Sequence, residues 1–454
     1  PDLGLEINIT IDKDNKYLTI SDTGIGMTRD ELIENLGTIA KSGTEAFLQE
    51  LSQNKDQKDA DLGGMIGRFG VGFYSVFMVA DRVEATTKSY KEGEPAQRWV
   101  SDGLGGYEIE EPDGEAMRGT TFVIHLKEDA EEFLEKHMVE SIIKKHSNFI
   151  SFPILLEEEK VNTIPALWRE PKFSIKPEQY KEFYSFLTFD QDEPLETIHV
   201  AVDAPVQFTS LLFIPEKNLD LFGFDRNKYG LDLYARRVLI QKDNKDLIPE
   251  YLGFLKGLVD AEDLPLNISR ETLQENVVIR KISQTVVKQA LTHLTKVAEN
   301  NEDQYAKFWE AHNKVFKLCY SDFTNQDKLM PLVRFNSSAN DDDKGLTSFD
   351  QYVSRAKTDQ KAIYYLFGPS RAAIESNPHL EIFKRKGVEV LYLYEPIDEF
   401  VMDAFRQYKE FEIQSVENAD LTKLDEYPDL TEEAKPEVEA LSQEQETSFD
   451  DLIK

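Results

Sequence analysis

The sequence predicts an α+β fold for residues 1–157, followed by two α/β units. In the first part, short apolar stretches of alternating pattern follow one another closely and are joined by tight turns, which favours adjacent strands in an α+β layer. Two glycine-patterned segments, at residues 22–26 and 67–72, interrupt these strands. Further along, strand-like stretches alternate with amphipathic ones, which is typical of sheets covered by helices.

The composition is that of a globular protein with room for several domains. The chain has 454 residues, 40% of them hydrophobic, which predicts about three domains with cores of their own. The formal charge of −33 disfavours nucleic acids as partners, because phosphate binding depends on Lys and Arg. No apolar run reaches the ~20 residues that a membrane span needs, so no membrane contact is expected.

Cysteine and histidine usage limits the chemistry further. The single cysteine, Cys319, cannot form an intramolecular disulfide and suits a reducing compartment. It is expected to be a small buried apolar residue. The seven histidines show no paired spacing of metal ligands, so we expect no metal held by this chain alone.

Five strands and one helix start are expected in the first part. The strands are predicted at residues 5–11, 17–20, 82–87, 97–101 and 121–126, and a polar turn at 12–16 joins the first two. Thr28 and Glu31 have the spacing of a capping box, so a helix should start there. The insert at about 27–72 is rich in glycine and polar residues, which predicts a mobile flap.

The two glycine-patterned segments together indicate a nucleotide pocket. Asp22 follows a strand, so its carboxylate should project from the strand end and accept a hydrogen bond from an exocyclic amine such as that of adenine. Residues 67–72 carry glycines where backbone can approach a phosphate closely, and the helix-prone stretch at 73–80 would present its N-terminus to the anion. The alternatives are a plain turn at Asp22 and a dinucleotide fold with Glu84 or Glu94 as its acidic residue, but that fold leaves Asp22 without a role.

A large α/β unit is predicted at residues 163–305. It should contain strands at 197–202, 209–213 and 231–241, followed by a long amphipathic helix. The apolar residues of that helix recur at steps of three and four and form one stripe: Ile279, Ile282, Val286, Ala290, Leu294 and Val297. Ser269 is a suitable N-cap, and Arg270 and Gln274 lie on one face of the first turns.

A smaller α/β unit is predicted at residues 306–410. A strand at 362–366, a helix through 381–384 and a strand at 388–394 indicate a β-α-β motif. Residues 411–454 are acidic and sparse in apolar groups. We expect them to start a truncated C-terminal domain or to form a solvated acidic tail.

Several motifs, in this order, resemble those of the 90-kDa heat-shock chaperone family, and the resemblance covers nearly the whole chain. The motifs are Asp22-Thr-Gly-Ile-Gly-Met27, Leu36-Gly-Thr-Ile-Ala-Lys-Ser-Gly-Thr44, Ile66-Gly-Arg-Phe-Gly-Val-Gly-Phe-Tyr-Ser75, Arg118-Gly-Thr-Thr121, Tyr234-Ala-Arg-Arg-Val238, Leu266-Asn-Ile-Ser-Arg-Glu-Thr-Leu-Gln274, Leu332-Val-Arg-Phe-Asn-Ser-Ser338 and Ile363-Tyr-Tyr365. The short joint near residue 160 resembles the bacterial and mitochondrial members. The resemblance implies a two-layer Bergerat-type ATP-binding domain and a two-part middle domain.

The resemblance also implies a role for individual residues in an ATP or ADP site. Asp22 would receive the adenine amine, with Thr120 beside it, and Lys41 would be the lid-hinge residue near the phosphates. Other positions resemble the wall around the base and ribose, namely Gly24, Gly26, Met27, Asn35 and Leu36. The phosphate loop would be formed by Gly67, Phe69, Gly70, Val71, Gly72 and Phe73. Arg270 resembles the middle-domain arginine that reaches the γ-phosphate, with Gln274 and Asn267 shaping its loop.

One departure from the family concerns the ends of the chain. In the family, a helix before the first strand carries Glu-x-x-x-Asn, whose glutamate is the general base and whose asparagine holds Mg²⁺. No such motif precedes Asp22, and Glu6 lies within a predicted strand. We therefore expect a fragment that lacks this helix and the C-terminal dimerisation domain and is inactive alone. The full-length protein is expected to be a homodimer that closes around client proteins in the bacterial cytoplasm, with the mitochondrial matrix as the alternative.

Two other readings of the pocket stay open at this point. One is a DNA topoisomerase or mismatch-repair ATPase, which would use a lysine from the second domain and a basic surface for DNA. The other is a client-binding scaffold that does not hydrolyse nucleotide, with aromatic contacts at Trp168, Phe186, Phe222 and Phe224, although aromatic residues in such patterns more often belong to a core. A histidine kinase is less suitable, because some 300 residues follow the pocket here.

Overall fold

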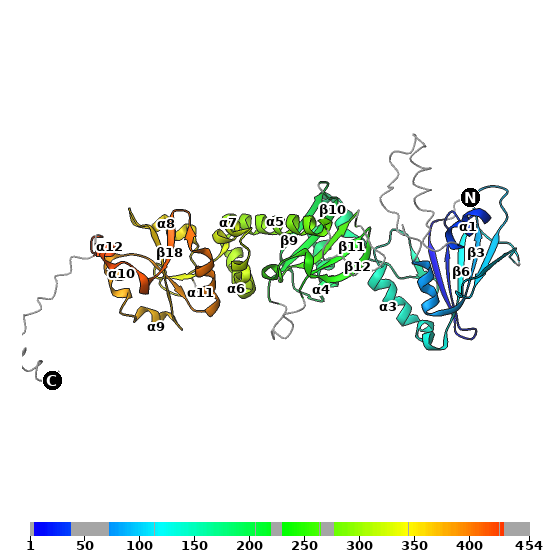
Figure 1. Ribbon diagram of the computed structural model, residues 1–454, viewed down its shortest axis with the longest axis horizontal. Coiled ribbons are helices and arrows are strands. Elements are labelled where there is room, and N and C mark those ends of the chain that lie inside the picture. Colours follow the sequence, from blue (N-terminus) through cyan, green and yellow to red (C-terminus); the bar gives the residue numbers. More distant parts are fainter. Residues whose placement is uncertain are drawn as a thin grey trace, which may run out of the picture. The chain divides into compact units, whose positions relative to one another are not determined.

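The structure is a computed structural model that describes residues 4–37, 72–112, 114–204, 206–218, 229–262, 264, 277–343, 345–425 and 427–430 (Figure 1). The chain divides into two compact units, residues 1–290 and 291–454, and each is described here by itself. The finer division into four parts stays a prediction. Among the described helices, none combines the length and apolar character that a membrane crossing requires.

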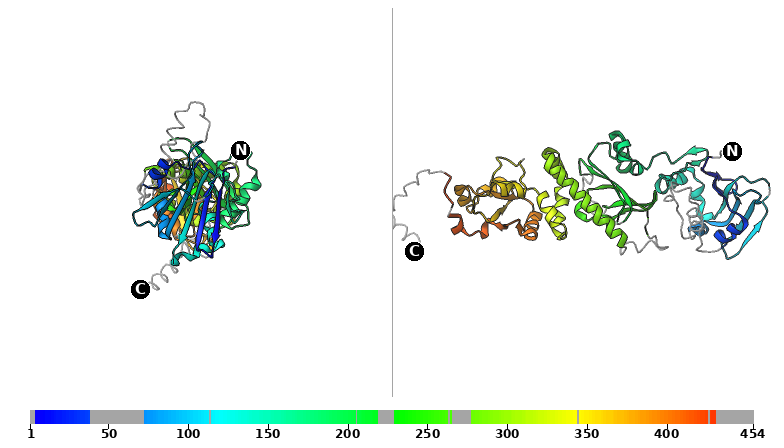
Figure 2. Two further views of the ribbon diagram at one scale, coloured as in Figure 1. Left: turned by 90° about the vertical axis from the view of Figure 1, so that its right-hand side faces the viewer. Right: turned by 90° about the horizontal axis from the view of Figure 1, so that it is seen from above.

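The first unit begins with an eight-stranded sheet of order β5-β4-β3-β6-β2-β1-β7-β8. Its strands are β1 Ile7–Asp12, β2 Tyr17–Asp22, β3 Ala80–Lys88, β4 Gln97–Ser101, β5 Tyr107–Glu110, β6 Gly119–Leu126, β7 Ile154–Leu156 and β8 Glu159–Lys160. Neighbouring strands are antiparallel except the parallel pair β1 and β7. Figure 2 shows the strands of this part side by side in blue and cyan. The α+β prediction for this part is confirmed.

Helix α1, Arg29–Leu36, starts at the predicted capping box. The backbone N–H of Thr28 donates to Glu31 Oε2 at 2.8 Å, and the backbone N–H of Glu31 donates to Thr28 Oγ1 at 3.3 Å. Leu32 and Leu36 on its inner face are buried in the same core as Trp99 of β4. The capping residues therefore fix where the helix begins, and the two leucines pack the helix against the sheet.

Two details of this part differ from the prediction. The helix expected over 73–80 is a 3₁₀ turn, η2, Phe73–Met78, and β3 begins directly after it, because the backbone groups of β3 pair with β6 and β4 instead of continuing a helix. Strands β5, β7 and β8 were not expected, because they have only four, three and two residues and are too short to give a clear strand pattern. The remaining elements are η3 Glu128–Leu134 and α3 Lys136–His146.

The middle of the chain forms a five-stranded sheet of order β12-β11-β13-β10-β9. The strands are β9 Pro194–Val202, β10 Phe208–Pro215, β11 Leu231–Ala235, β12 Val238–Asn244 and β13 Lys256–Ala261, and the helical segments before and between them are η4 Leu167–Arg169, η5 Lys172–Ser174, α4 Pro177–Thr188, η6 Lys245–Leu247 and η7 Glu250–Leu252. An aromatic core packs α4 and η4 against the sheet through Phe149, Trp168, Phe183, Tyr184 and Phe213.

The single strand predicted at 231–241 is wrong. The segment forms a hairpin, β11 and β12, whose turn is Arg236-Arg237 with φ of 51° and 69°. Two arginines are not a turn signal in sequence, since such turns usually contain Asn or Gly. Strand β13 was missed because five of its six residues are buried, which removes the alternation that marks a half-buried strand.

Helix α5, Val277–Asn300, confirms the predicted stripe, since all six of its apolar positions are buried. The second unit continues with α6 Glu302–Phe316, η9 Lys317–Ser321, α7 Gln326–Leu329, η10 Met330–Leu332 and α8 Phe349–Arg355. Cys319 is fully buried, as predicted.

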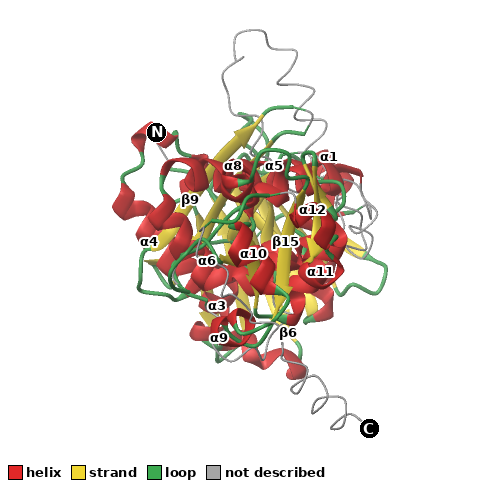
Figure 3. Ribbon diagram, turned by 90° about the vertical axis from the view of Figure 1, so that its left-hand side faces the viewer, coloured by secondary structure: helices red, strands yellow, loops and turns green. Residues whose placement is uncertain are grey.

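The sheet of the second unit has the order β14-β16-β15-β18-β17. Its strands are β14 Asn336–Ser337, β15 Ala362–Phe367, β16 Val390–Leu393, β17 Gln407–Tyr408 and β18 Phe411–Ser415, and its helical segments are α9 Arg371–Glu375, α10 Leu380–Lys386, α11 Pro396–Phe405, η11 Val416–Asn418 and α12 Leu421–Asp425. Strands β15 and β16 are parallel, which confirms the β-α-β motif. Figure 3 shows α10, α11 and α12 around β15.

Of the two alternatives for residues 411–454, the solvated acidic tail is wrong for the part that the structure describes. Strand β18 pairs with β15 inside the sheet, and the side chains of Val416 and Leu424 are buried in the core of this unit. Apolar residues are few in this segment, but they fall at positions that face the core. An average over the composition therefore underestimated how much of it packs.

Candidate functional site

Asp22 is the last residue of β2, as the sequence predicted, and lies opposite Thr120 of β6. The backbone N–H of Gly24 donates to Asp22 Oδ1 at 2.8 Å. Burial raises the pKa of the Asp22 carboxyl above its usual value, while hydrogen bonds from the backbone N–H groups of Gly24 and Thr120 act in the opposite direction. The result is a half-buried carboxylate whose remaining lone pairs can accept further donors.

A buried threonine that the sequence did not reveal supports this strand end. Thr87 of β3 is fully buried, and its Oγ1 lies 3.0 Å from Oγ1 of Thr120 and 3.2 Å from the carbonyl oxygen of Gly119. The same oxygen accepts the backbone N–H of Met27 at 2.9 Å. Thr87 thus connects the segment after Asp22 to β6. Only the register of β3 against β6 brings these residues together, so no local pattern could have found Thr87.

Gly26 and Gly119 are needed because backbone passes close to backbone at this place. Gly26 has φ of +61°, and a Cβ there would lie 1.9 Å from the carbonyl oxygen of Lys88. Gly119 has φ of +120°, and a Cβ there would lie 2.0 Å from the carbonyl oxygen of Asp22. The glycine at 26 therefore serves the packing of the loop on the sheet, in addition to any contact with a ligand.

We expect Gly119→Ala to lower the free energy of unfolding by about 2 kcal/mol or more, because the new Cβ combines positive-φ strain with overlap on Asp22. Denaturant unfolding measures this. Gly105→Ala is the matched control, since Gly105 has φ of +108° but open space around a Cβ. Equal losses in the two variants would show that the contact with Asp22 is unimportant.

Several other described residues of the predicted site have side chains that pack in the core of the sheet. Asn35 is half-buried on α1 and Leu36 is buried in the core. Met27 packs against the same core. The ring of Phe73 lies 5.6 Å from Trp99 and 5.4 Å from Phe122, measured between centroids. Phe73 therefore anchors the residues after the predicted phosphate loop, and only its backbone is left for a phosphate.

Much of the predicted phosphate site cannot be placed. Gly72 is described and directly precedes η2. The remaining predicted residues lie outside the described part of the chain: Lys41, Gly67, Phe69, Gly70, Val71, Arg270 and Gln274. Of the predicted flap at 27–72, only residues 27–37 and 72 are described. The roles of all these residues stay predictions.

The four aromatic residues considered for client contacts do not form one exposed group among the described residues. Trp168 is buried and donates its Nε1–H to Asp260 at 2.7 Å, so it belongs to the core. Phe186 is 36% exposed at the rim of the same core. Phe222 and Phe224 lie outside the described residues.

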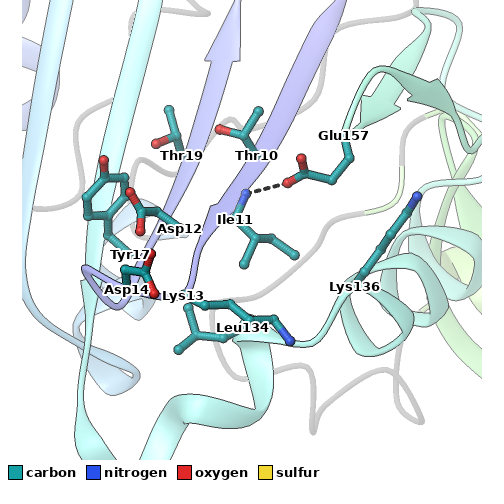
Figure 4. A pocket seen from close by; sticks show the side chains of 10 residues that line it. All are labelled: Thr10, Ile11, Asp12, Lys13, Asp14, Tyr17, Thr19, Leu134, Lys136 and Glu157. Carbon is teal, nitrogen blue, oxygen red and sulfur yellow. Dashed lines mark hydrogen bonds between the residues drawn. The ribbon is translucent and has the colours of Figure 1, made fainter.

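A cavity of about 670 Å³ lies beside the β1–β2 turn (Figure 4). It is lined by Thr10, Ile11, Asp12, Lys13, Asp14, Tyr17, Thr19, Leu134, Lys136 and Glu157. The backbone N–H of Ile11 donates to Glu157 Oε1 at 2.7 Å across one wall. None of the residues predicted to bind nucleotide lines this cavity, so it is separate from the Asp22 site.

Comparison with known proteins gives a family match for the N-terminal part of the chain and another for the remainder. A family model described as Hsp90 protein matches residues 155–454, and one described as histidine kinase-, DNA gyrase B- and HSP90-like ATPase matches residues 4–102. Chaperone protein HtpG of Nitratidesulfovibrio vulgaris is 57% identical over 455 residues, which span all of this chain and 71% of the relative.

Two further relatives agree with this assignment. Chaperone protein HtpG of Oleidesulfovibrio alaskensis is 56% identical over all of this chain and 70% of its own length. The mitochondrial TNF receptor-associated protein 1 homolog of Dictyostelium discoideum is 41% identical over 98% of this chain and 61% of its own length. The ATPase description is shared with other classes of enzyme, but the Hsp90 match covers residues 155–454. The chain therefore belongs to the Hsp90 family of ATP-dependent chaperones and is of the bacterial type.

Proposed function

We propose that the full-length protein binds ATP at the strand end around Asp22 and couples its hydrolysis to the folding of client proteins. The observation that carries the proposal is the half-buried Asp22 carboxylate, which keeps acceptor positions beside a loop packed tightly on the sheet. An adenine amine is a donor that suits this acceptor. The family assignment supports the same ligand.

In this proposal, the phosphates lie along residues 67–73 and Arg270 of the middle part approaches the γ-phosphate. An arginine from another part of the chain stabilises charge on the transferred phosphoryl group only when the parts close, which couples hydrolysis to shape. Gln274 and Asn267 would shape the segment that carries Arg270. The support for these roles is the motif at 266–274 together with the family assignment.

Mg²⁺ normally accompanies ATP in such enzymes and supplies charge neutralisation at the phosphates. Among the described residues, no group of three Asp, Glu, His or Cys side chains could hold a metal ion. The resemblance to the family would assign the metal ligand to the asparagine of the Glu-x-x-x-Asn helix.

The proposed setting follows from the bacterial relatives. The full-length protein would work as a homodimer in the bacterial cytoplasm on unfolded or partly folded client proteins, and the mitochondrial relative makes the matrix the alternative. Asp22 and the Thr87–Thr120 pair would hold the base, while client contacts would lie elsewhere on the chain.

We expect the full-length protein to suppress aggregation of a chemically unfolded model enzyme and to release it in folded form only with hydrolysable ATP. Light scattering and recovered enzyme activity measure the two steps. A non-hydrolysable ATP analogue is the control. Suppression of aggregation without any ATP turnover would instead support the client-binding scaffold.

A further inference from the structure

A cavity of about 450 Å³ in the first unit lies between α3, the end of α4 and the β11–β12 hairpin. Three of its lining residues, Phe149, Tyr234 and Leu239, are buried members of the aromatic core on the middle sheet. The ring of Phe149 lies 4.7 Å from that of Trp168, measured between centroids, so the chain just after α3 is held at this core. The cavity therefore brings apolar surface of the core within reach of a ligand.

Phe189 lines the same cavity and holds its ring out to the solvent. Its side chain is 84% exposed. It is the residue directly after α4 and has φ of 61° and ψ of 9°, the left-handed conformation that Gly or Asn usually adopts at this position. Phe189 is thus unfavourable both for its backbone and for its exposed ring. An aromatic ring kept at this double cost suits a contact with a partner.

Lysines lie beside this apolar surface. Lys145 at the end of α3 and Lys242 of β12 line the cavity and are exposed. Among the residues that the structure describes, neither has a carboxylate within 4 Å. Lys144 differs, because its Nζ lies 2.5 Å from Oε1 of Glu140. In a chain with a formal charge of −33, two unpaired lysines next to apolar surface are complementary to acidic residues of a partner.

A buried carboxylate supplies a polar position in the cavity. Asp232 of β11 is 8% exposed, and its Oδ1 accepts the backbone N–H of Asp243 at 3.0 Å. Within the described residues, its Oδ2 has no hydrogen-bond partner. Burial raises the pKa of the Asp232 carboxyl, while the hydrogen bond from Asp243 acts in the opposite direction. Buried acceptors are normally satisfied, so Oδ2 is suited to a donor that a ligand brings, such as a peptide N–H.

A polypeptide segment supplies the complement of all three features, namely an apolar side chain, acidic side chains and backbone N–H donors. A purely apolar molecule would leave the lysines and Asp232 without partners. A nucleic acid would match the lysines and the aromatic rings, but each nucleotide adds a negative charge, which the charge of −33 on the chain opposes. The observations therefore favour a protein partner.

We propose that this cavity is a docking site for a segment of another protein in which apolar residues are flanked by acidic residues. The apolar side chains pack against Phe186 and Phe189, the acidic side chains bind Lys145 and Lys242, and a backbone N–H donates to Asp232. The site is separate from the proposed nucleotide site. The inference therefore goes beyond the proposed function and does not rest on it.

The test uses the full-length protein and fluorescein-labelled peptides of equal length. The acidic probe has Phe-Leu at its centre and Glu on both sides. In a second probe Lys replaces every Glu, and in a third Ala replaces Phe and Leu. Fluorescence anisotropy measures the Kd of each. We expect the acidic probe to bind about tenfold or more tightly than either of the others, because both the charges and the central apolar pair contribute.

Substitutions then locate the binding. Phe189→Asn should weaken the acidic probe about tenfold, and its thermal midpoint should equal or exceed that of the parent, because Asn tolerates the left-handed conformation. Lys145→Glu combined with Lys242→Glu should reverse the preference between the acidic and the lysine probe. Phe173→Ala is the matched control: Phe173 is 94% exposed in η5 but does not line the cavity, so the Kd should stay unchanged.

Several results would overturn this inference. They are no binding of the acidic probe by the parent, equal affinity for the three probes, equal losses in Phe189→Asn and Phe173→Ala, or a lower thermal midpoint in Phe189→Asn, which would make the ring a structural residue. Displacement of the probe by single-stranded DNA would indicate a nucleic-acid site instead. Self-association that Phe189→Asn abolishes would indicate a second copy as the occupant.

The two proposals fail separately in these experiments. ATP turnover should stay at the parent's rate in Phe189→Asn and in the double lysine variant, because neither touches the proposed nucleotide site. Loss of probe binding with normal turnover supports the docking site. Absence of probe binding in a parent that hydrolyses ATP would overturn the docking site and leave the proposed function intact.

Discussion

Asp22→Asn is expected to weaken ATP binding by roughly 10- to 100-fold, because a charge-assisted hydrogen bond contributes about 1.5 to 3 kcal/mol. Asn can still accept a bond from the backbone N–H of Gly24, so the loop geometry should be retained. The loss of ATP affinity is therefore expected without a change in the loop. Isothermal titration of ATP into the full-length protein measures it, and Asp14→Asn, at an exposed position in the β1–β2 turn, is the matched control.

The thermal stability of Asp22→Asn independently checks whether Asp22 serves the ligand or the fold, because the direction of the expected change can be stated. Burial raises the pKa of Asp22 in the folded protein above its unfolded value. Ionised Asp22 therefore destabilises the fold at pH values above the folded pKa, and this penalty disappears as the pH falls through it. Because Asn carries no charge, the variant without nucleotide should unfold at the same temperature as the parent or higher at pH 7. A clear drop would mean that Asp22 is a structural residue.

Arg270→Ala is expected to lower ATP turnover by roughly 10³-fold, the lower end of what an arginine at a transferring phosphoryl group contributes. ATP affinity should change little, because the arginine acts on the transition state more than on the bound substrate. Steady-state hydrolysis by the full-length protein, together with the Kd for ATP, separates the two effects. Arg280→Ala is the matched control, since Arg280 is an exposed arginine in the following helix α5. Equal effects of the two substitutions would contradict the assignment.

Local patterns predicted those elements whose ends and faces are set by neighbouring residues. The capping box at Thr28 and Glu31 located α1, because both hydrogen bonds lie within one turn. The apolar stripe of α5 was visible for the same reason, since its period is a property of the helix itself. The position of Asp22 followed from the strand before it.

Contacts between distant segments could not be predicted in this way. The hairpin turn at Arg236-Arg237 is favoured by bonds to Asp260 and Glu262, about 25 residues away, and has no local signal. Thr87 reaches Thr120 only through the register of β3 and β6. Phe73 looked like part of a phosphate loop, yet its ring packs on Trp99 and Phe122. In each case tertiary packing decides what the side chain does.

The most direct test of the account is the preference for ATP over ITP, whose base lacks the exocyclic amine, in the parent protein and in Asp22→Asn. If Asp22 accepts that amine, the parent should bind ATP roughly 10-fold or more tightly than ITP. The ratio should approach one in Asp22→Asn, because an amide can donate to the oxygen of inosine as well as accept from the amine of adenosine. A ratio that is the same in both proteins would contradict the claim that Asp22 recognises the base.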